Sequence, residues 1–332
     1  RFTIVGSEWV DYLAKWDGSR WSEVGRGVNA RVKALAVFDD GTGPALYVAG
    51  DFSAVGSSTD WTGTDRSVAA NRVAKWNGED WEEVAGGFST EALNGYVRME
   101  VLADLEGTSL FLWGSGVPVL RLRNNVWEPL DSGDYSTGDL VAFDDGSGAA
   151  LFRSYAGASG SYLQKRVAGA WINVTPLTAD EHHLVVHSSV DGTFLYAADA
   201  FSGLPGSPPG VHIRRWNGTS WSAPLGVADA LFEVPDLAGP AKLHAVVERS
   251  NPGEDTVLTW NGAAFVPLLP SSNSTGSVDS VAVLEETSGS SIFFSGLDRA
   301  GGVSLGGGIG RWDGTAVSPA GQGLENGGTK VF

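Results

Sequence analysis

Short apolar stretches alternate with turn-forming residues along the whole chain. In the clearest unit four such stretches follow one another, at residues 32–39, 45–52, 71–76 and 81–84. The first two flank the turn Asp39-Asp40-Gly41, and the last two flank Asn77-Gly78. Stretches of this length between Gly-containing turns are typical of antiparallel strands joined as hairpins. The pattern predicts a meander of four strands, and no long stretch follows the helical period.

A tryptophan motif marks the repetition of this unit. The sequence Trp-[Asp/Asn]-Gly-x-x-Trp stands at 16–21, 76–81 and 216–221, and less complete copies occur later in the chain. The sites equivalent to Trp16 are Trp76, Leu122, Arg166, Trp216, Trp260 and Trp312, and successive sites lie 44 to 60 residues apart. Four-stranded units at about this spacing are the signature of β-propeller blades. We therefore predict an all-β, seven-bladed β-propeller of four-stranded antiparallel blades.

The expected propeller occupies the whole chain, 1–332, as a single domain. Six blades are expected at approximately 27–86, 87–131, 132–175, 176–226, 227–270 and 271–326. Residues 1–26 hold three candidate strands, and 327–332 resemble the opening of a first strand. We expect these two segments to form the seventh blade together, with the C-terminal strand pairing with the N-terminal blade. Such closure would remove exposed sheet edges.

The best copy of the motif carries a family resemblance. Residues 71–78, Asn-Arg-Val-Ala-Lys-Trp-Asn-Gly, fit the pattern N-R-[IV]-A-[KR]-W-[DN]-G-x-x-W-x-x-[LV]-G. This pattern resembles the repeats of secreted bacterial β-propeller proteins. It is also similar to the Kelch-like repeats of fungal cell-polarity surface proteins, although the paired glycine of true Kelch repeats is missing. The resemblance implies an extracellular or surface propeller and no particular activity.

Charge and composition narrow the classes of partner. The net charge of −17 disfavours nucleic acid and an anionic membrane surface as partners. The chain has no Cys, which excludes disulfides, thiol catalysis and Cys-ligated metals. No apolar run of about 18 residues predicts insertion into a membrane. We expect an extracellular or cell-surface location, with the periplasm as an alternative.

The repeated tryptophans and aspartates have a structural and a binding interpretation. Tryptophans in every blade can line sugar pockets or fill the space between blades. The repeat positions decay to Leu122, Arg166, Phe265 and Val317, which favours packing. The two Asp-Asp-Gly turns, at 39–41 and 144–146, could hold Ca²⁺, but both lack the spaced carboxylates of a dedicated loop.

Aligned first strands suggest a polar site. The position of Ala34 corresponds in this alignment to Glu100, Asp139, His183, His244 and Ser280. Two carboxylates and up to three histidines, with His182 in the preceding position, would then meet at one mouth of the central channel. Such a set can bind a first-row metal ion, perform general acid–base chemistry, or simply face water. Glu100, Asp139, His183 and His244 are candidate catalytic residues and candidate metal ligands; we expect no cofactor, with a bound metal ion as the alternative.

The longest insertion, 53–70, lies on the same predicted face. It carries Trp61 between Asp60 and Arg66, outside the repeat positions. An exposed Trp flanked by charges suits stacking on a sugar or contact with a protein, and the alternative is that it packs back on the rim. We predict that Trp61, Asp60 and Arg66 bind a ligand.

The sequence favours a non-catalytic extracellular binding or scaffold module. It would recognise a protein or a glycan through one propeller face. One alternative is a polysaccharide lyase or hydrolase with its site at the channel mouth. Another is a structural subunit of an extracellular assembly, and the oligomeric state is left open.

Overall fold

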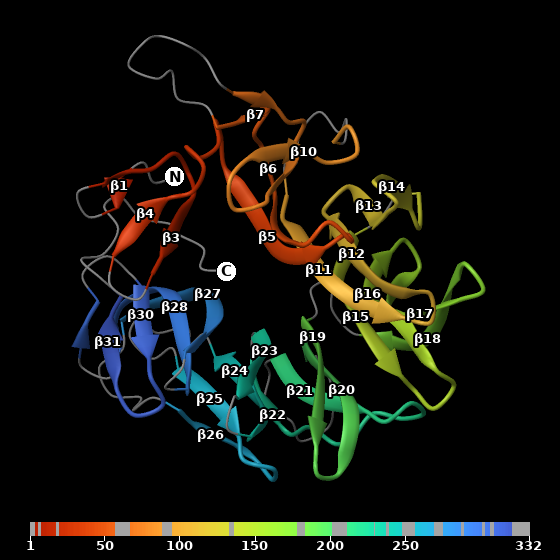
Figure 1. The fold of residues 1–332 in the computed structure, drawn as a ribbon. Helices are drawn as coiled ribbons and strands as arrows, with labels where there is room; N and C mark the ends of the chain where they lie inside the picture. The colour runs from red at the N-terminus through yellow and green to blue at the C-terminus, as the bar shows by residue number, and fades with distance from the viewer. Residues whose placement is uncertain are drawn as a thin grey trace, which may run out of the picture.

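The computed structural model describes most of the chain as strands and turns (Figure 1). The described residues are 4–5, 8–17, 20–56, 67–87, 95–132, 136–177, 183–200, 211–228, 230–236, 239–247, 256–268, 275–286, 289–300, 303–305 and 309–320. Within these ranges there is no helix, and consequently no apolar helix of membrane-spanning length.

Six sheets follow one another along the chain, each built on a four-stranded path, and the sixth has an additional short strand. The first blade contains β5 (Val32–Asp39), β6 (Pro44–Gly50), β9 (Val73–Trp76) and β10 (Trp81–Glu83). The second contains β11 (Val97–Asp104), β12 (Gly107–Gly114), β13 (Val117–Arg123) and β14 (Val126–Pro129). The third contains β15 (Ser136–Asp144), β16 (Ala149–Gly157), β17 (Gly160–Val167) and β18 (Ala170–Leu177). All neighbours pair antiparallel, so each sheet is the predicted meander.

The later blades repeat this order. The fourth contains β19 (His183–Ser189), β20 (Gly192–Ala200), β21 (Val211–Trp216) and β22 (Gly226–Val227). The fifth contains β23 (Ala230–Asp236), β24 (Gly239–Val247), β25 (Thr256–Trp260) and β26 (Phe265–Pro267). The sixth contains β27 (Thr275–Glu286), β28 (Gly289–Ala300), β30 (Ile309–Trp312) and β31 (Val317–Pro319), with β29 (Val303–Ser304) beside β28. The six sheets stand around a common axis with the first strand of each innermost, which is a β-propeller arrangement (Figure 1).

The prediction of seven four-stranded blades is wrong for the described residues, which form six. The N-terminal segment instead forms two separate two-stranded sheets. One pairs β1 (Ile4–Val5) with β2 (Glu8–Trp9), and the other pairs β3 (Ala14–Trp16) with β4 (Trp21–Glu23). The closing strand that we expected at 327–332 lies outside the described residues.

Local geometry explains why the N-terminal segment supplies fewer blade strands than expected. Tyr12 and Arg72 hold the same positive φ, 61° and 71°, four residues before Trp16 and Trp76. The hairpin β1–β2 therefore corresponds to the loop hairpin of the first blade, in which β7 (Ala54–Val55) pairs with β8 (Val68–Ala69). Only β3 and β4 match blade strands, and they correspond to the third and fourth.

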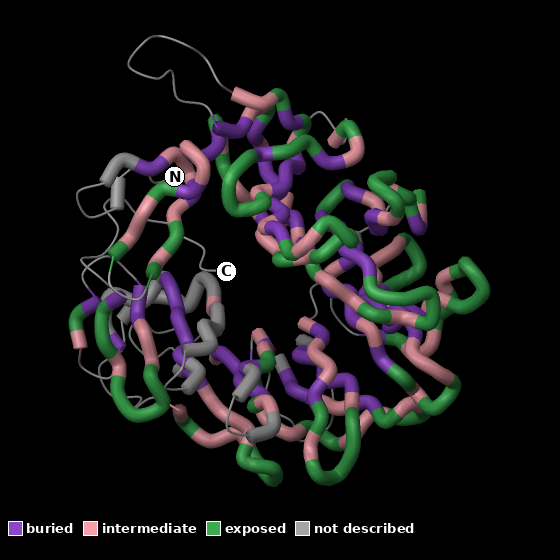
Figure 2. Tube along the Cα trace, viewed as in Figure 1, coloured by how far each residue is buried: buried purple, intermediate pink, exposed green. Residues whose placement is uncertain are grey.

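Apolar side chains of neighbouring sheets form the core. Buried residues recur along the strands of the sheets (Figure 2). Tyr47 of the first blade, for example, is fully buried in one cluster with Leu110 of the second. The N-terminal segment takes part in this packing on both sides. Trp16 packs with Phe293 of the sixth blade, and Leu13 packs with Val48 of the first. Burial of apolar area at about 25 cal/mol per Å² makes these contacts the main stabilising contribution.

The repeated motif residues build strand pairs and turns. In three copies the two tryptophans of the motif pair across its tight turn, with ring centroids 5.4 Å apart. The Asn77 side chain between them accepts hydrogen bonds from the backbone N–H groups of Glu79 and Asp80. Gly78 in the same turn has a φ of 106°, which a residue without Cβ adopts at little cost. The motif is therefore a structural unit of tight turn and aromatic pair.

Candidate functional site

We call the side of the molecule at which the inner strands begin the strand-start side, and the side with the turns after them the turn side. On the strand-start side three inner strands place polar residues at equivalent positions: Arg98 on β11, Asp139 on β15 and His183 on β19. Arg98 Nη1 donates to Asp139 Oδ1 at 2.7 Å. His183 Nδ1 lies 3.7 Å from Asp139 Oδ2. Three blades thus meet at one carboxylate.

The protein holds Asp139 firmly in this arrangement. Its Oδ2 accepts a hydrogen bond of 3.0 Å from the backbone N–H of Leu184, and its own N–H donates to Ser154 Oγ at 2.8 Å. Asp139 is buried, whereas the side chain of Arg98 is 40 % exposed and that of His183 is 32 % exposed. Asp139 therefore acts as a fixed anchor, and the groups around it are accessible to solvent.

Glu100 lies beside this anchor with different electrostatics. It is an exposed residue of the inner strand β11. Desolvation of its carboxyl by the neighbouring inner strands is the largest effect that raises the pKa of Glu100 to about 7; the nearby charge of Asp139 adds to it and the charge of Arg98 opposes it. Among the described residues none forms a hydrogen bond or ion pair with its carboxyl. Glu100 is consequently a carboxyl that can exchange a proton near neutral pH.

The predicted alignment of first strands places Asp139 and His183 correctly. In the second blade it is shifted by two residues, because it puts Glu100 where the structure has Arg98. Leu46 pairs with Trp76 and Leu110 with Leu122, so the residue equivalent to Ala34 in the second blade is Arg98. Glu100 still points to the same side of its strand because the side-chain period is two. Sequence reasoning missed Arg98 because a cation was not sought in a row of carboxylates and histidines.

The expected place of His244 among the first strands is wrong. His244 lies on β24, a second strand, where it pairs with Thr259 as Tyr47 pairs with Lys75. The same position holds an aromatic ring in every other blade, namely Tyr47, Phe111, Phe152, Tyr196 and Phe293. His244 is 2 % exposed and stacks on Phe232 at 5.3 Å. It is a buried packing residue of the fifth blade, and a comparison of second strands could have identified it.

Burial determines the protonation of His244. Desolvation, with the charge of Lys242 adding to it, lowers the pKa to about 4. Neither ring nitrogen makes a hydrogen bond of normal geometry with the described residues. His244 is therefore neutral under ordinary conditions and takes no part in the group around Asp139.

A second pair of a histidine and a carboxylate, His187 and Glu233, lies further along the inner strands β19 and β23. His187 Nδ1 is 2.8 Å from Glu233 Oε1, which joins the fourth blade to the fifth. His187 is buried and also makes an edge contact with the ring of Tyr196. Glu233 was not found from the sequence because the first strand of the fifth blade was aligned fourteen residues too late, with His244 in the position that Ala230 occupies.

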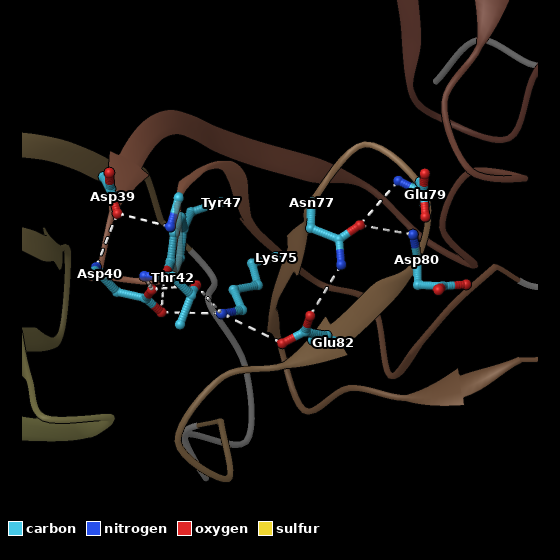
Figure 3. A network of polar contacts seen from close by, with 11 residues as sticks. Asp39, Asp40, Thr42, Tyr47, Lys75, Asn77, Glu79, Asp80 and Glu82 are labelled. Carbon is cyan, nitrogen blue, oxygen red and sulfur yellow. Dashed lines mark hydrogen bonds and ion pairs between the residues drawn. The ribbon is translucent and has the colours of Figure 1, made fainter.

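The turn side of the first blade carries an ionic network around Lys75 (Figure 3). Lys75 on β9 donates to Asp40 Oδ2 at 3.0 Å and lies 3.3 Å from Glu82 Oε2. Asp40 also accepts hydrogen bonds from Thr42 and Tyr47. Although burial would raise the pKa of Asp40, these hydrogen bonds outweigh it and hold that pKa well below its usual range. A lysine ammonium thus already neutralises the turn that we considered for Ca²⁺.

The basic position before the motif tryptophan recurs across the blades. Its residues are Lys75, Arg121, Lys165, Arg215 and Arg311, with Thr259 in the fifth blade. In the third blade Lys165 contacts Asp145 and Ser147 as Lys75 contacts Asp40 and Thr42. In the second blade Arg121 contacts Glu106 and Glu128. The [KR] of the repeat pattern was the sequence signal for this network.

Two further predictions concern binding groups. Trp61, Asp60 and Arg66 lie outside the described residues. Over the part of the chain that the structure describes, no group of three or more His, Asp or Glu residues is placed to hold a metal ion.

Comparison with known proteins adds no family to these observations. No protein-family model matches the chain, and no curated protein matches it significantly.

Proposed function

We propose that this chain is a binding or scaffold module that acts at the cell surface or outside the cell. The recognition surface is the strand-start side around Asp139, and the ligand is a polar group of a protein or a carbohydrate. The observation that carries the proposal is the convergence of Arg98 and His183 on the anchored carboxylate of Asp139, with the exposed Glu100 two residues from Arg98 on the same strand. Accessible donors and acceptors on rigid strands suit polar recognition, because little ordering is needed on binding.

The chemistry of this surface favours a ligand rich in hydroxyl or amide groups. Arg98 offers several N–H donors in a fixed plane, and Glu100 offers an acceptor when ionised and a donor when protonated. Sugar hydroxyls and peptide amides can pair with both residues. The acidic balance of the chain, −17, argues against a nucleic-acid partner.

The test is a screen of the labelled chain against arrays of glycans and of extracellular proteins, repeated with Glu100→Gln. We expect at least one ligand whose affinity falls about tenfold in the variant, which corresponds to a lost charge-assisted hydrogen bond. A matched control is Glu128→Gln, a half-exposed carboxyl on the turn side. Ligands bound equally by all three proteins would contradict the proposed surface.

One observation favours a second candidate, a polysaccharide hydrolase or lyase. Glu100 has a pKa of about 7, and the nearby carboxylate of Asp139 is paired with Arg98. Two carboxyl groups in unequal environments are the arrangement used for acid–base catalysis. The assay is the release of reducing ends or of unsaturated products from polysaccharides, and Glu100→Gln should abolish it.

A further inference from the structure

The strand that carries Asp139 is irregular at this residue. The pairing of β15 with β16 shifts between Thr137 and Leu140, which leaves two residues of β15 opposite one residue of β16. This is a β-bulge, an irregularity that disrupts the ladder locally and redirects a side chain. Because the regular ladder does not fix the backbone here, other contacts must determine where the Asp139 carboxylate stands.

Donors from the second blade hold the backbone of this bulge. The indole Nε1 of Trp113, on β12, donates to the carbonyl oxygen of Gly138 at 3.2 Å. The hydroxyl of Tyr96, directly before β11, donates to the carbonyl oxygen of Thr137 at 2.5 Å. The position of the bulge therefore depends on the neighbouring blade as well as on its own.

A buried arginine holds the side chain at the start of the bulge. Arg153 Nη1 donates to Thr137 Oγ1 at 3.1 Å and also to the carboxylate of Asp131, which follows the last strand of the second blade. Its Nε donates to Gln164 Oε1 at 2.9 Å. The guanidinium carbon lies 4.1 Å from the ring centroid of Trp171. The planar group thus fixes its polar partners in one geometry, which a lysine could not do.

The position of Arg153 is apolar in the other five blades. The equivalent residues are at most 2 % exposed and are Val48, Leu112, Ala197, Ala245 and Phe294. Arg153 is itself 4 % exposed, so its charge is buried beside Asp131. Replacement of a buried ion pair by apolar residues is often neutral or stabilising. Stability alone therefore does not explain an arginine here, and its contact with Thr137 indicates a local role at the bulge.

From these contacts we propose that Arg153 is a positioning residue, which acts on Asp139 through Thr137. By fixing the start of the bulge it places the Asp139 carboxylate between Arg98 and His183. This role concerns the geometry of the site whatever ligand it binds. Only the affinity measurement described below rests on the proposed function.

The experiment measures hydrogen exchange at the amide of Leu184, which donates to Asp139 Oδ2 at 3.0 Å. Thr137→Val keeps a β-branched side chain of similar size and removes the acceptor of Arg153. We expect the exchange rate at Leu184 to rise about fivefold or more, as for one lost hydrogen bond. Thr137→Ser retains the hydroxyl and should keep the original rate.

The matched control is Gln164→Leu. It removes another acceptor of the same guanidinium but lies on β17, which does not pair with β15. The exchange rate at Leu184 should stay unchanged in this variant. The amide of Val119 is an internal reference, since it donates to Asp131 Oδ1 at 3.1 Å on the other side of Arg153. Its rate should stay the same in Thr137→Val, which separates a local shift from a general loosening.

Two results would overturn the proposal. One is an unchanged rate at Leu184 in a Thr137→Val chain whose near-UV circular dichroism shows an intact fold. The other is an equal rise in Gln164→Leu. If Thr137→Val does not fold, Arg153→Lys takes its place under the same criteria, because it keeps the charge and lacks the planar fork.

The affinity for a ligand from the array screen separates this proposal from the proposed function. We expect Thr137→Val to weaken that affinity about fivefold. A raised exchange rate at Leu184 with unchanged affinity would support the positioning role and contradict the recognition surface.

Discussion

The ammonium of Lys165 lies 2.6 Å from Oδ2 of Asp145, and Lys75 and Asp40 repeat this contact at 3.0 Å two blades earlier. In both blades the third strand is tied to the turn between the two inner strands. Burial would raise the pKa of Asp145, but the hydrogen bonds from Lys165 and Ser147 outweigh it and lower that pKa. The pair therefore stabilises the folded state at neutral pH.

Loss of this pair should be measurable as a loss of stability. Asp145→Asn leaves a buried ammonium without its counter-charge and should cost about 1–3 kcal/mol of unfolding free energy. Urea denaturation followed by tryptophan fluorescence gives the value. The comparison variant is Asp80→Asn, an exposed turn residue, which should cost less than about 0.5 kcal/mol. Equal effects of the two substitutions would contradict the structural role of the pair.

His244 makes the fold sensitive to acid. Its folded-state pKa, about 4, lies below the ordinary value of 6.5, so the unfolded chain binds the proton more strongly. The stabilising contribution is complete above about pH 6.5 and is lost as the pH falls toward 4. His244→Phe restores the aromatic residue of the other blades and should remove up to about 3 kcal/mol of this loss. Thermal unfolding of the original chain and of His244→Phe between pH 4 and 8 tests this prediction. An equal loss of stability below pH 6.5 in both proteins would refute it.

Glu100 should act in the opposite direction. Its folded-state pKa, about 7, lies above the unfolded value of 4.5, so the folded chain holds the proton more strongly. Its contribution is complete below about pH 4.5 and is lost as the pH rises through 7. A ¹³C NMR titration of the carboxyl reports the pKa directly, and Glu100→Gln should flatten the stability profile over this range. A midpoint near 4.5 would show that the neighbouring strands do not desolvate the carboxyl.

Two adjacent glycines give a test of the repeat geometry. Both Gly86 and Gly87 have positive φ, 74° and 66°, but only at Gly87 would a Cβ meet another group, the carbonyl oxygen of Asn71 at 2.0 Å. Gly86→Ala should cost roughly 1 kcal/mol of backbone strain. Gly87→Ala should cost at least about 2 kcal/mol more, because the backbone must move apart. Thermal unfolding of the two variants measures the difference, and equal losses of stability would contradict the close approach of Gly87 to Asn71.

The sequence predicted the strand order well because the repeat records it locally. The Asn77-Gly78 turn and the Trp76–Trp81 pair are determined by residues within one hairpin, so their pattern reads directly as structure. The same holds for the turn at Asp40. The blade count could not be obtained in this way, because the hairpin β1–β2 resembles blade strands in composition and differs from them only in its place relative to Tyr12.

The candidate site was predicted in part for a similar reason. Asp139 and His183 follow from the alignment of inner strands, but the position of His244 depended on a register that the irregular fifth blade obscures. Arg98 and the pKa of Glu100 depend on contacts between blades, which no local pattern encodes. Long-range packing is therefore what the sequence left undetermined.

The most direct test of the proposed recognition surface compares two arginines of matched exposure, Arg98 at 40 % on the strand-start side and Arg123 at 39 % on the turn side. The measurement is the dissociation constant, by isothermal titration calorimetry, for a ligand found in the array screen. We predict that Arg98→Ala weakens binding about tenfold or more and that Arg123→Ala leaves it unchanged. Binding that survives Arg98→Ala and is lost in Arg123→Ala would place recognition on the opposite side and contradict the account.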